Sequence, residues 1–171
     1  CECELDEWEK SGIGDTCTMA VDMGDFDDVD PRTETASGNL VPGEDSDWFV
    51  FNANDLLQDS CNTFNLEIEL VSGSSYFSFE VYQDSCDVVD NLICTGAEVF
   101  QWTVNFGTED MGECACAAEV GRAVTDHLAT VGTHACGTHG GRYFVKIYRQ
   151  TGVPVSCDSY TLQVRNGFSA E

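Results

Sequence analysis

The stretch TFNLEIEL, residues 63–70, decides the fold class because apolar and polar side chains alternate along it. From Phe64 to Leu70 every second residue is apolar, and the residues between them are asparagine or glutamate. Successive side chains of a β-strand point to opposite faces of the sheet, so this pattern predicts a strand with one buried and one solvated face. Strands of this kind build antiparallel sheets that cover a core with one face.

The same period of two recurs along the rest of the chain. Clusters of glycine, asparagine, aspartate and serine separate the alternating segments, as expected for turns between strands. We therefore expect an all-β protein made of half-buried antiparallel strands. The further alternating segments are FSFEVY (77–82), FQWTVNF (100–106), YFVKIYR (143–149) and YTLQVR (160–165).

Residues 42–51, PGEDSDWFVF, place acids directly before four consecutive apolar residues. Both faces of the apolar segment 48–51 would be buried, which predicts a strand that lies centrally in a sandwich. Glu44, Asp45 and Asp47 fall on the loop that leads into this strand. Carboxylates on such a loop can accept backbone N–H groups or coordinate a cation.

Helical patterns are scarce in this chain. The segment CTMAVDMGD, residues 17–25, fits one or two helical turns that end at Gly24. Residues 116–132 have the best helical composition, with apolar residues three to four positions apart. They fall within a long Cys- and His-bearing insertion loop, residues 107–141, between two predicted strands. Disulfides could hold a loop of this length in place.

The length of 171 residues suits one domain. Residues 1–16 show no alternation and contain a single large aromatic residue, Trp8. We interpret them as an N-terminal extension. The β-sandwich domain is then predicted at residues 17–168.

The formal net charge of −24, from 31 acidic and 7 basic residues, excludes some partners. Nucleic acid is disfavoured because phosphate contacts need clustered lysine and arginine, and anionic lipid is disfavoured for the same reason. No apolar run approaches the ~20 residues that a transmembrane helix needs. The acidity suits solubility in a salty or calcium-bearing medium.

The chain contains ten cysteines, an even number, and most of them lie outside tight motifs. A reducing cytosol rarely holds so many cysteines unless they bind metal. We therefore predict an oxidising location, extracellular or at the cell surface, and up to five disulfides. The cysteines are Cys1, Cys3, Cys17, Cys61, Cys86, Cys94, Cys114, Cys116, Cys136 and Cys157.

The expected disulfides join cysteines that flank a short loop, precede two core strands, or lie close together in the insertion. Cys1 is either lipidated or held by a disulfide. The partners of Cys3 and Cys17 are left open. We expect bonds between Cys86 and Cys94, between Cys61 and Cys157, and between Cys136 and either Cys114 or Cys116.

The segments TETASGNLVPGEDSDWFVFNA (33–53) and GRYFVKIYRQTGVPVSCDSYTLQVRNG (141–167) carry glycine-led and aromatic strand motifs. Together they resemble a known family, the bacterial pre-peptidase C-terminal domain, and the resemblance spans about residues 20–167. It implies an antiparallel, jelly-roll-like β-sandwich of about eight strands. It also implies a non-catalytic module of secreted proteases and bacterial surface proteins. The ten cysteines and the 107–141 insertion depart from the family pattern.

The segment DMGDFDDVD, residues 22–30, is the densest group of acids in the chain. Calcium binds six to eight oxygen ligands, which closely spaced aspartates can supply. The resemblance implies a calcium site where acids of the N-terminal segment meet acids of the sandwich. The alternative is a solvated acidic face. The nominated ligands are Asp27, Asp28 and Asp30, together with Asp45 or Asp47.

A zinc site is the second metal hypothesis, and it competes with disulfide formation. Four ligands in tetrahedral geometry are needed, and the 107–141 insertion holds five candidates. We favour disulfides, because the other cysteines already indicate an oxidising location. The candidates are Cys114, Cys116, His134, Cys136 and His139.

No sequence motif of a hydrolase, zinc protease, P-loop enzyme or dinucleotide-binding enzyme occurs in the chain. We therefore predict a protein that is not an enzyme, although an unrecognised pair of catalytic carboxylates is a third alternative. The first hypothesis is a structural or adhesive surface protein whose partner is itself or another surface protein, including a self-assembling filament subunit. The second is a calcium-supported module that binds a glycan or matrix polymer for a secreted hydrolase.

Overall fold

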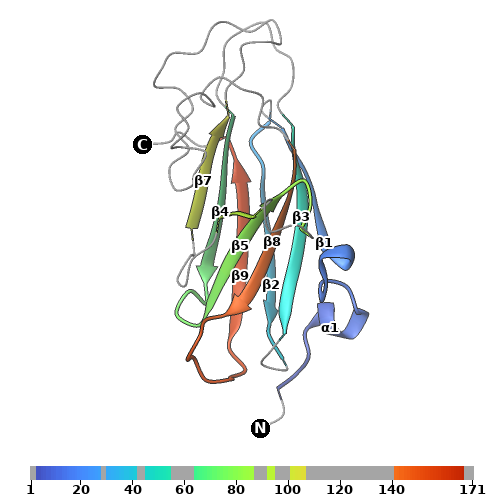
Figure 1. Ribbon diagram of the computed structural model, residues 1–171, viewed down its shortest axis with the longest axis vertical. Helices are drawn as coiled ribbons and strands as arrows, with labels where there is room; N and C mark the ends of the chain where they lie inside the picture. Colours follow the sequence, from blue (N-terminus) through green and yellow to red (C-terminus); the bar gives the residue numbers. More distant parts are fainter. Residues whose placement is uncertain are drawn as a thin grey trace, which may run out of the picture.

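The computed structural model describes seven segments of the chain: residues 3–27, 30–41, 45–54, 64–86, 92–94, 101–106 and 141–167. Within them, two β-sheets face each other across a core (Figure 1). The strands are β1 (Val21–Asp27), β2 (Thr33–Asn39), β3 (Ser46–Asn54), β4 (Phe64–Ser72), β5 (Phe77–Gln83), β6 (Leu92–Cys94), β7 (Gln101–Phe106), β8 (Gly141–Arg149) and β9 (Ser159–Asn166).

One sheet contains five strands in the order β1-β3-β8-β5-β6, and the other contains four in the order β2-β9-β4-β7. The predicted jelly-roll-like β-sandwich is therefore confirmed. One pair departs from the antiparallel expectation, because β1 runs parallel to β3 at the edge of the five-stranded sheet, with Val21 opposite Phe49. The predicted insertion loop, residues 107–141, lies outside the described residues except for Gly141.

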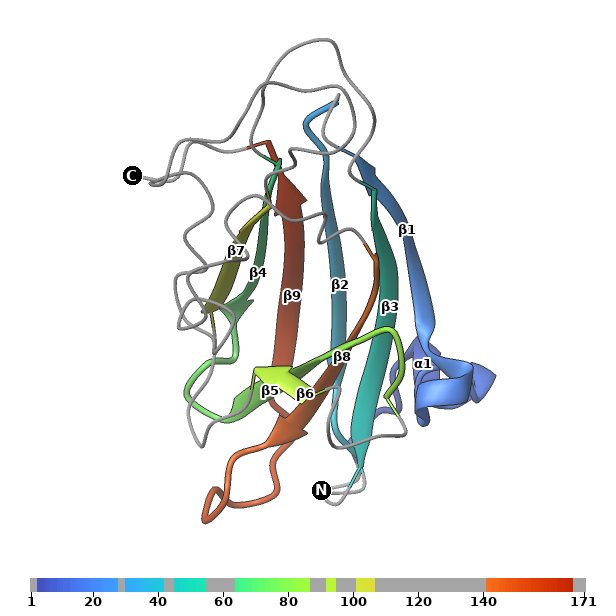
Figure 2. The same ribbon diagram turned by 45° about the horizontal axis from the view of Figure 1, so that its top comes forward.

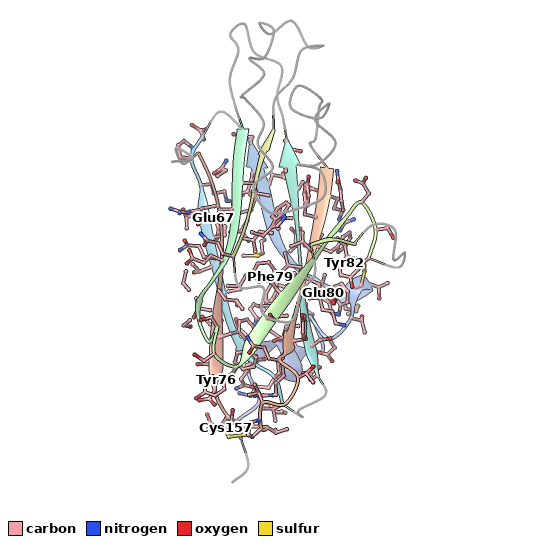
Figure 3. The ribbon with its side chains drawn as sticks, turned by 60° about the vertical axis from the view of Figure 1, so that its left-hand side comes forward. Glu67, Tyr76, Phe79, Glu80, Tyr82 and Cys157 are labelled. Atoms are coloured by element: carbon pink, nitrogen blue, oxygen red, sulfur yellow. A yellow bond between two sulfur atoms is a disulfide. The ribbon has the colours of Figure 1, made fainter. Side chains whose placement is uncertain are left out.

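The core is filled by the alternating side chains that the sequence pattern points inward. Phe79 of β5 is fully buried between the sheets, and Glu67 of β4 belongs to the other sheet (Figure 3). Segment 48–51 is buried on both faces, as its composition predicts. Phe49 belongs to the main core, whereas Trp48 packs with Phe144 in a smaller cluster.

The N-terminal part of the chain contains two short helices, α1 (Glu7–Ser11) and the 3₁₀ helix η1 (Cys17–Met19). The predicted helix over residues 17–25 is thus wrong beyond Met19, because β1 begins at Val21. Pairing with β3 outweighs the local preference of this segment. Gly24 has a φ of 84° at an irregularity in the pairing, which hides the strand alternation. Neither helix is long and apolar enough to span a membrane, a finding limited to the described residues.

Candidate functional site

The N-terminal segment, residues 3–20, which we name the strap, is covalently attached to the sandwich at two points. Cys3 forms a disulfide with Cys157, which precedes β9 of the four-stranded sheet, and the Cα atoms are 5.3 Å apart. Cys17 forms a disulfide with Cys86, which follows β5 of the five-stranded sheet, and the Cα atoms are 6.2 Å apart. The strap therefore ties the two sheets together. Its helix α1 lies beside one end of β1 (Figure 2).

Both observed disulfides contradict pairings expected from the sequence. The bond between Cys61 and Cys157 is wrong because Cys157 bonds to Cys3. The expectation failed because β4 and β9 are antiparallel neighbours. Residues that precede two antiparallel strands lie at opposite ends of the sheet. The bond between Cys86 and Cys94 is also wrong, because Cys86 bonds to Cys17. In the pairing of β5 with β6, Cys94 lies opposite Val81, five residues before Cys86.

The remaining disulfide predictions concern cysteines whose structure is not described. They stay predictions, as does the lipidation or bonding of Cys1. The zinc candidates fall in the same undescribed part of the chain. These residues are Cys1, Cys61, Cys114, Cys116, Cys136, His134 and His139.

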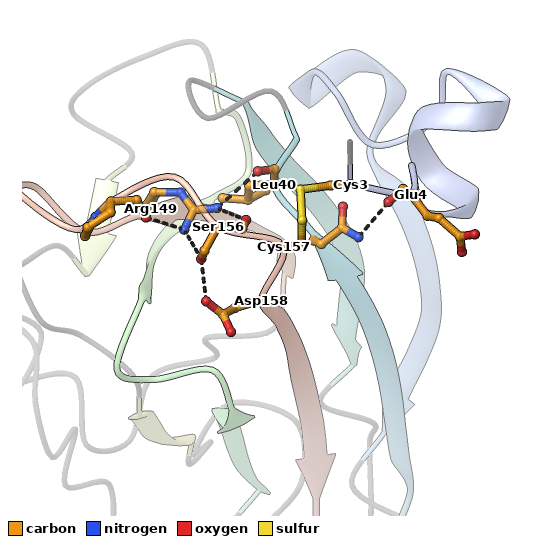
Figure 4. The surroundings of a disulfide bond; sticks show 9 residues. Cys3, Glu4, Leu40, Arg149, Ser156, Cys157 and Asp158 are labelled. Carbon is orange, nitrogen blue, oxygen red and sulfur yellow. Dashed lines mark hydrogen bonds between the residues drawn. A yellow bond between two sulfur atoms is a disulfide. The ribbon is translucent and has the colours of Figure 1, made fainter. Parts of the chain in front are cut away.

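An arginine holds the loop that carries Cys157 (Figure 4). The guanidinium of Arg149, at the end of β8, donates hydrogen bonds to the carbonyl oxygens of Leu40 at 3.1 Å and Ser156 at 3.2 Å. It also donates to the hydroxyl of Ser156 at 3.3 Å, and its Cζ lies 5.0 Å from the ring centre of Phe77. One planar side chain thus ties the backbone just before Cys157 to the residue that follows β2.

The strap covers part of β2, which is an edge strand among the described strands. The indole N–H of Trp8 donates to the carbonyl oxygen of Ser37 at 3.1 Å. The N–H of Asn39 donates to Oδ2 of Asp6 at 2.8 Å, and its side-chain amide donates to the carbonyl oxygen of Glu4 at 3.1 Å. Outward-facing backbone groups of an edge strand can recruit another strand. The strap satisfies two of these groups within its own chain.

Beneath the strap, Asp47 of β3 and Tyr160 of β9 are both fully buried. The hydroxyl of Tyr160 donates to Oδ2 of Asp47. Burial raises the pKa of Asp47 from 3.8 to about 7, against the lowering effect of the Tyr160 hydrogen bond. Repulsion from Asp6, Asp45 and Asp15 raises this pKa further. The carboxyl of Asp47 therefore holds its proton to a higher pH than a solvent-exposed aspartate does.

A groove of about 360 Å³ runs between the edge strands β1 and β2. Arg32 crosses it, and its guanidinium donates to the carbonyl oxygens of Asp25 at 2.5 Å and Met23 at 3.3 Å. The same guanidinium bonds to the carboxylate of Glu34 at 3.0 Å. The ring of Trp8 lines the groove, so aromatic and charged groups converge there.

The structure separates the nominated calcium ligands into two groups. Asp27 and Asp30 lie at the C-terminal end of β1, where Oδ1 of Asp27 accepts the N–H of Asp30 at 2.9 Å. Asp45 and Asp47 lie at the N-terminal end of β3, and β3 runs parallel to β1. The two groups are therefore at opposite ends of the sheet. Asp28 is outside the described residues, among which no group of three potential metal ligands is assembled.

Sequence reasoning missed most of the strap contacts. Asp6 and Arg149 bind backbone groups of distant segments, and such partners leave no pattern in the sequence. Trp8 gave the usable signal, because it is the single large aromatic residue in the predicted extension. In the structure it packs against the core, with its ring centre 6.3 Å from that of Phe49.

Comparisons with known proteins show a distant similarity of fold. No protein family model and no curated protein sequence matches the chain. Among solved structures, the chain is similar to the pre-peptidase C-terminal domain of a collagenase from Bacillus anthracis. The two chains are 11% identical with a TM-score of 0.35, and the match covers 86% of this chain and 94% of the other.

Proposed function

We propose that this chain is a non-catalytic structural or adhesive module of an extracellular surface protein. The observation that carries the proposal is the attachment of the strap to both sheets of its own sandwich through Cys3 and Cys17. Disulfides persist in oxidising environments, which supports an extracellular location. The net charge of −24 would keep such a module soluble in a salty medium.

The position of the strap also bears on self-assembly. A filament subunit that donates its N-terminal segment to a neighbour needs that segment to be free. Here Cys3 is bonded within the chain, and Trp8 packs against the chain's own core. We therefore propose that contacts with another copy, or with another surface protein, use surfaces other than the strap.

A second candidate function is supported by the groove between β1 and β2. Sugar-binding sites combine an aromatic surface with polar groups that hydrogen-bond hydroxyls, and the groove presents Trp8, Arg32 and Glu34. A glycan or matrix polymer is the proposed ligand of this alternative. Binding of soluble polysaccharides to the wild type, lost in Glu34→Gln and retained in Glu80→Gln on β5, would favour it. Calorimetric titration with calcium tests whether the ion contributes.

Surface labelling tests the first proposal directly. The chain has two lysines, and Lys10 is exposed on the strap. An amine label that does not cross membranes should modify Lys10 on intact cells that produce the protein. Mass spectrometry without reduction would identify the labelled peptide still linked through Cys3 to Cys157. Labelling that occurs only after cell lysis would overturn the extracellular assignment.

A further inference from the structure

The Cys3–Cys157 disulfide joins the strap to the start of the last strand. The two cysteines are 154 positions apart in sequence, and Cys157 lies two residues before β9 begins at Ser159. From there β9 runs along the long axis of the sandwich to Asn166 (Figure 1). The shortest covalent route from Cys3 to Gly167 therefore passes through the disulfide and along β9.

We propose that the domain is an inextensible, tension-bearing link, in which force between its two ends is carried by the Cys3–Cys157 disulfide and β9. The inference rests on the proposed structural role. A strand rises about 3.3 Å per residue and a fully stretched chain at most about 3.6 Å. Residues 157–167 are therefore close to their full length before any force acts. The residues between Cys3 and Cys157 lie off this covalent route.

The neighbours of β9 hold it along its length. It pairs antiparallel with β2 on one side and with β4 on the other. Hydrogen bonds between strands are perpendicular to the strand direction, so a pull along β9 loads many of them together. Arg165 of β9 also forms an ion pair with Glu67 of β4 at 2.7 Å.

Both ends of β9 are anchored by side chains as well. At the far end, the side-chain amide of Asn166 donates to the carbonyl oxygens of Asp27 and Asp30, and its Oδ1 accepts the N–H of Arg32 at 2.5 Å. Near the start, Tyr160 bonds to Asp47 across the core. Tension that enters β9 is thus shared with both sheets.

The second disulfide provides a matched control. The Cys17–Cys86 bond spans 69 positions, and both cysteines lie within the stretch between Cys3 and Cys157. It is therefore off the proposed route. Removing it should leave the length of the loaded domain unchanged, although it removes one disulfide just as the other variant does.

Single-molecule pulling of the whole chain between two handle domains, without reductant, tests the proposal. We expect no lengthening step for the wild type or for the double variant Cys17→Ser/Cys86→Ser. The double variant Cys3→Ser/Cys157→Ser should lengthen in a discrete step of about 70 Å or more. At least the roughly 20 residues between Cys136, the nearest preceding cysteine, and position 157 are then added to the stretched route, at up to about 3.6 Å each.

A complementary measurement covers the case in which Cys3→Ser/Cys157→Ser does not fold. A thiol reductant is added to wild-type molecules held at constant force, since Cys157 is exposed. Lengthening that begins on addition of reductant supports the route. Stepwise lengthening of the oxidised wild type, or of Cys17→Ser/Cys86→Ser, would overturn it.

These outcomes are distinct from those that bear on the proposed function. Pulling reports on the covalent route, whereas labelling of Lys10 on intact cells reports on location. If Lys10 is labelled on intact cells but the oxidised protein lengthens stepwise under force, the load-bearing proposal is wrong and the surface role stands. If Lys10 is labelled only after lysis and the oxidised protein shows no lengthening step, the load-bearing proposal stands and the surface role is wrong.

Discussion

The hydroxyl of Tyr160 donates a 2.5 Å hydrogen bond to Oδ2 of Asp47, and this bond crosses the core from β9 to β3. Gly38 of β2 pairs with Tyr160 of β9 and lies next to this bond. A Cβ atom at position 38 would be 2.6 Å from Oδ2 of Asp6 and 2.7 Å from the Tyr160 hydroxyl. The strap can therefore approach this buried pair because residue 38 has no side chain.

The raised pKa of Asp47 predicts a specific dependence of stability on pH. Between about pH 4 and pH 7 the folded protein keeps the proton of Asp47, while the unfolded chain, with a pKa near 3.8, loses it. The stabilisation from this group is complete below pH 3.8 and is lost as the pH rises to about 7. The slope is about 1.4 kcal/mol per pH unit within this window.

The variant Asp47→Asn has no proton to lose at this position. Its melting temperature relative to the wild type should therefore rise from about pH 4 to pH 7 and then level off. Tyr160→Phe removes the hydrogen bond that lowers the pKa of Asp47. The pH range over which this variant loses stability should therefore extend to higher pH than in the wild type. Thermal unfolding over a pH series measures both effects. A constant difference between Asp47→Asn and the wild type over this range would contradict the assignment.

The side chain of Arg149 should be irreplaceable by lysine. Its planar guanidinium group donates to the carbonyl oxygens of Leu40 and Ser156 at the same time. The single ammonium group of lysine does not reproduce this geometry. We expect Arg149→Lys to reduce the free energy of unfolding by about 1–3 kcal/mol. We also expect slower formation of the Cys3–Cys157 bond during oxidative refolding, as followed by mass spectrometry.

Arg142→Lys is the control for this experiment. Arg142 is exposed and lies over the ring of Phe144 at 5.2 Å. A lysine can keep such a contact, so the expected change is less than about 0.5 kcal/mol. Equal losses of unfolding free energy in Arg142→Lys and Arg149→Lys would show that the hydrogen bonds of Arg149 to Ser156 and Leu40 have no special role.

The parts of the fold that depend on local pattern were predictable from the sequence. The sequence alternation in β4, β5, β7, β8 and β9 identified these strands, because apolar residues recur at every second position along each of them. Strand β1 was missed because its parallel pairing with β3 is long-range and Gly24 interrupts its alternation. The same limit explains the disulfides, since Cys3 and Cys17 find partners through strand order rather than through spacing.

The two disulfides should stabilise the protein to a similar extent but protect different backbone groups. In the chain-entropy description, closing loops of 154 and 69 residues contributes roughly 4–5 kcal/mol each, because the effect grows only with the logarithm of loop length. Hydrogen exchange should differ. Cys3→Ser/Cys157→Ser should lose protection at the amides of Trp8 and Asn39, which bond to Asp6.

Cys17→Ser/Cys86→Ser is the matched variant for this comparison. It should keep slow exchange at Trp8 and Asn39 and lose it near Met19, whose N–H donates to the carbonyl oxygen of Thr16 at 2.9 Å. Uniform loss of protection along residues 3–20 in either variant would mean that the strap detaches as one unit from a single break.

Gly24 and Gly12 form a pair that separates backbone strain from loss of the Arg32 contact. Both have a positive φ, 84° and 67°, so alanine at either position costs about 1–2 kcal/mol in backbone strain. A Cβ atom on Gly24 would also lie 2.9 Å from Nη2 of Arg32, whereas one on Gly12 would have nothing within 4 Å. Gly24→Ala should therefore displace Arg32 from the carbonyl oxygens of Met23 and Asp25.

Displacing Arg32 would expose the outward-facing carbonyl groups of β1, which can then pair with a strand of another molecule. We expect Gly24→Ala to form dimers or larger species at concentrations where Gly12→Ala and the wild type do not. Arg32→Ala should do the same without strain at position 24. Size-exclusion chromatography with light scattering measures the masses. If Gly24→Ala and Arg32→Ala both keep the mass of the wild type, Arg32 does not prevent association at the edge of β1.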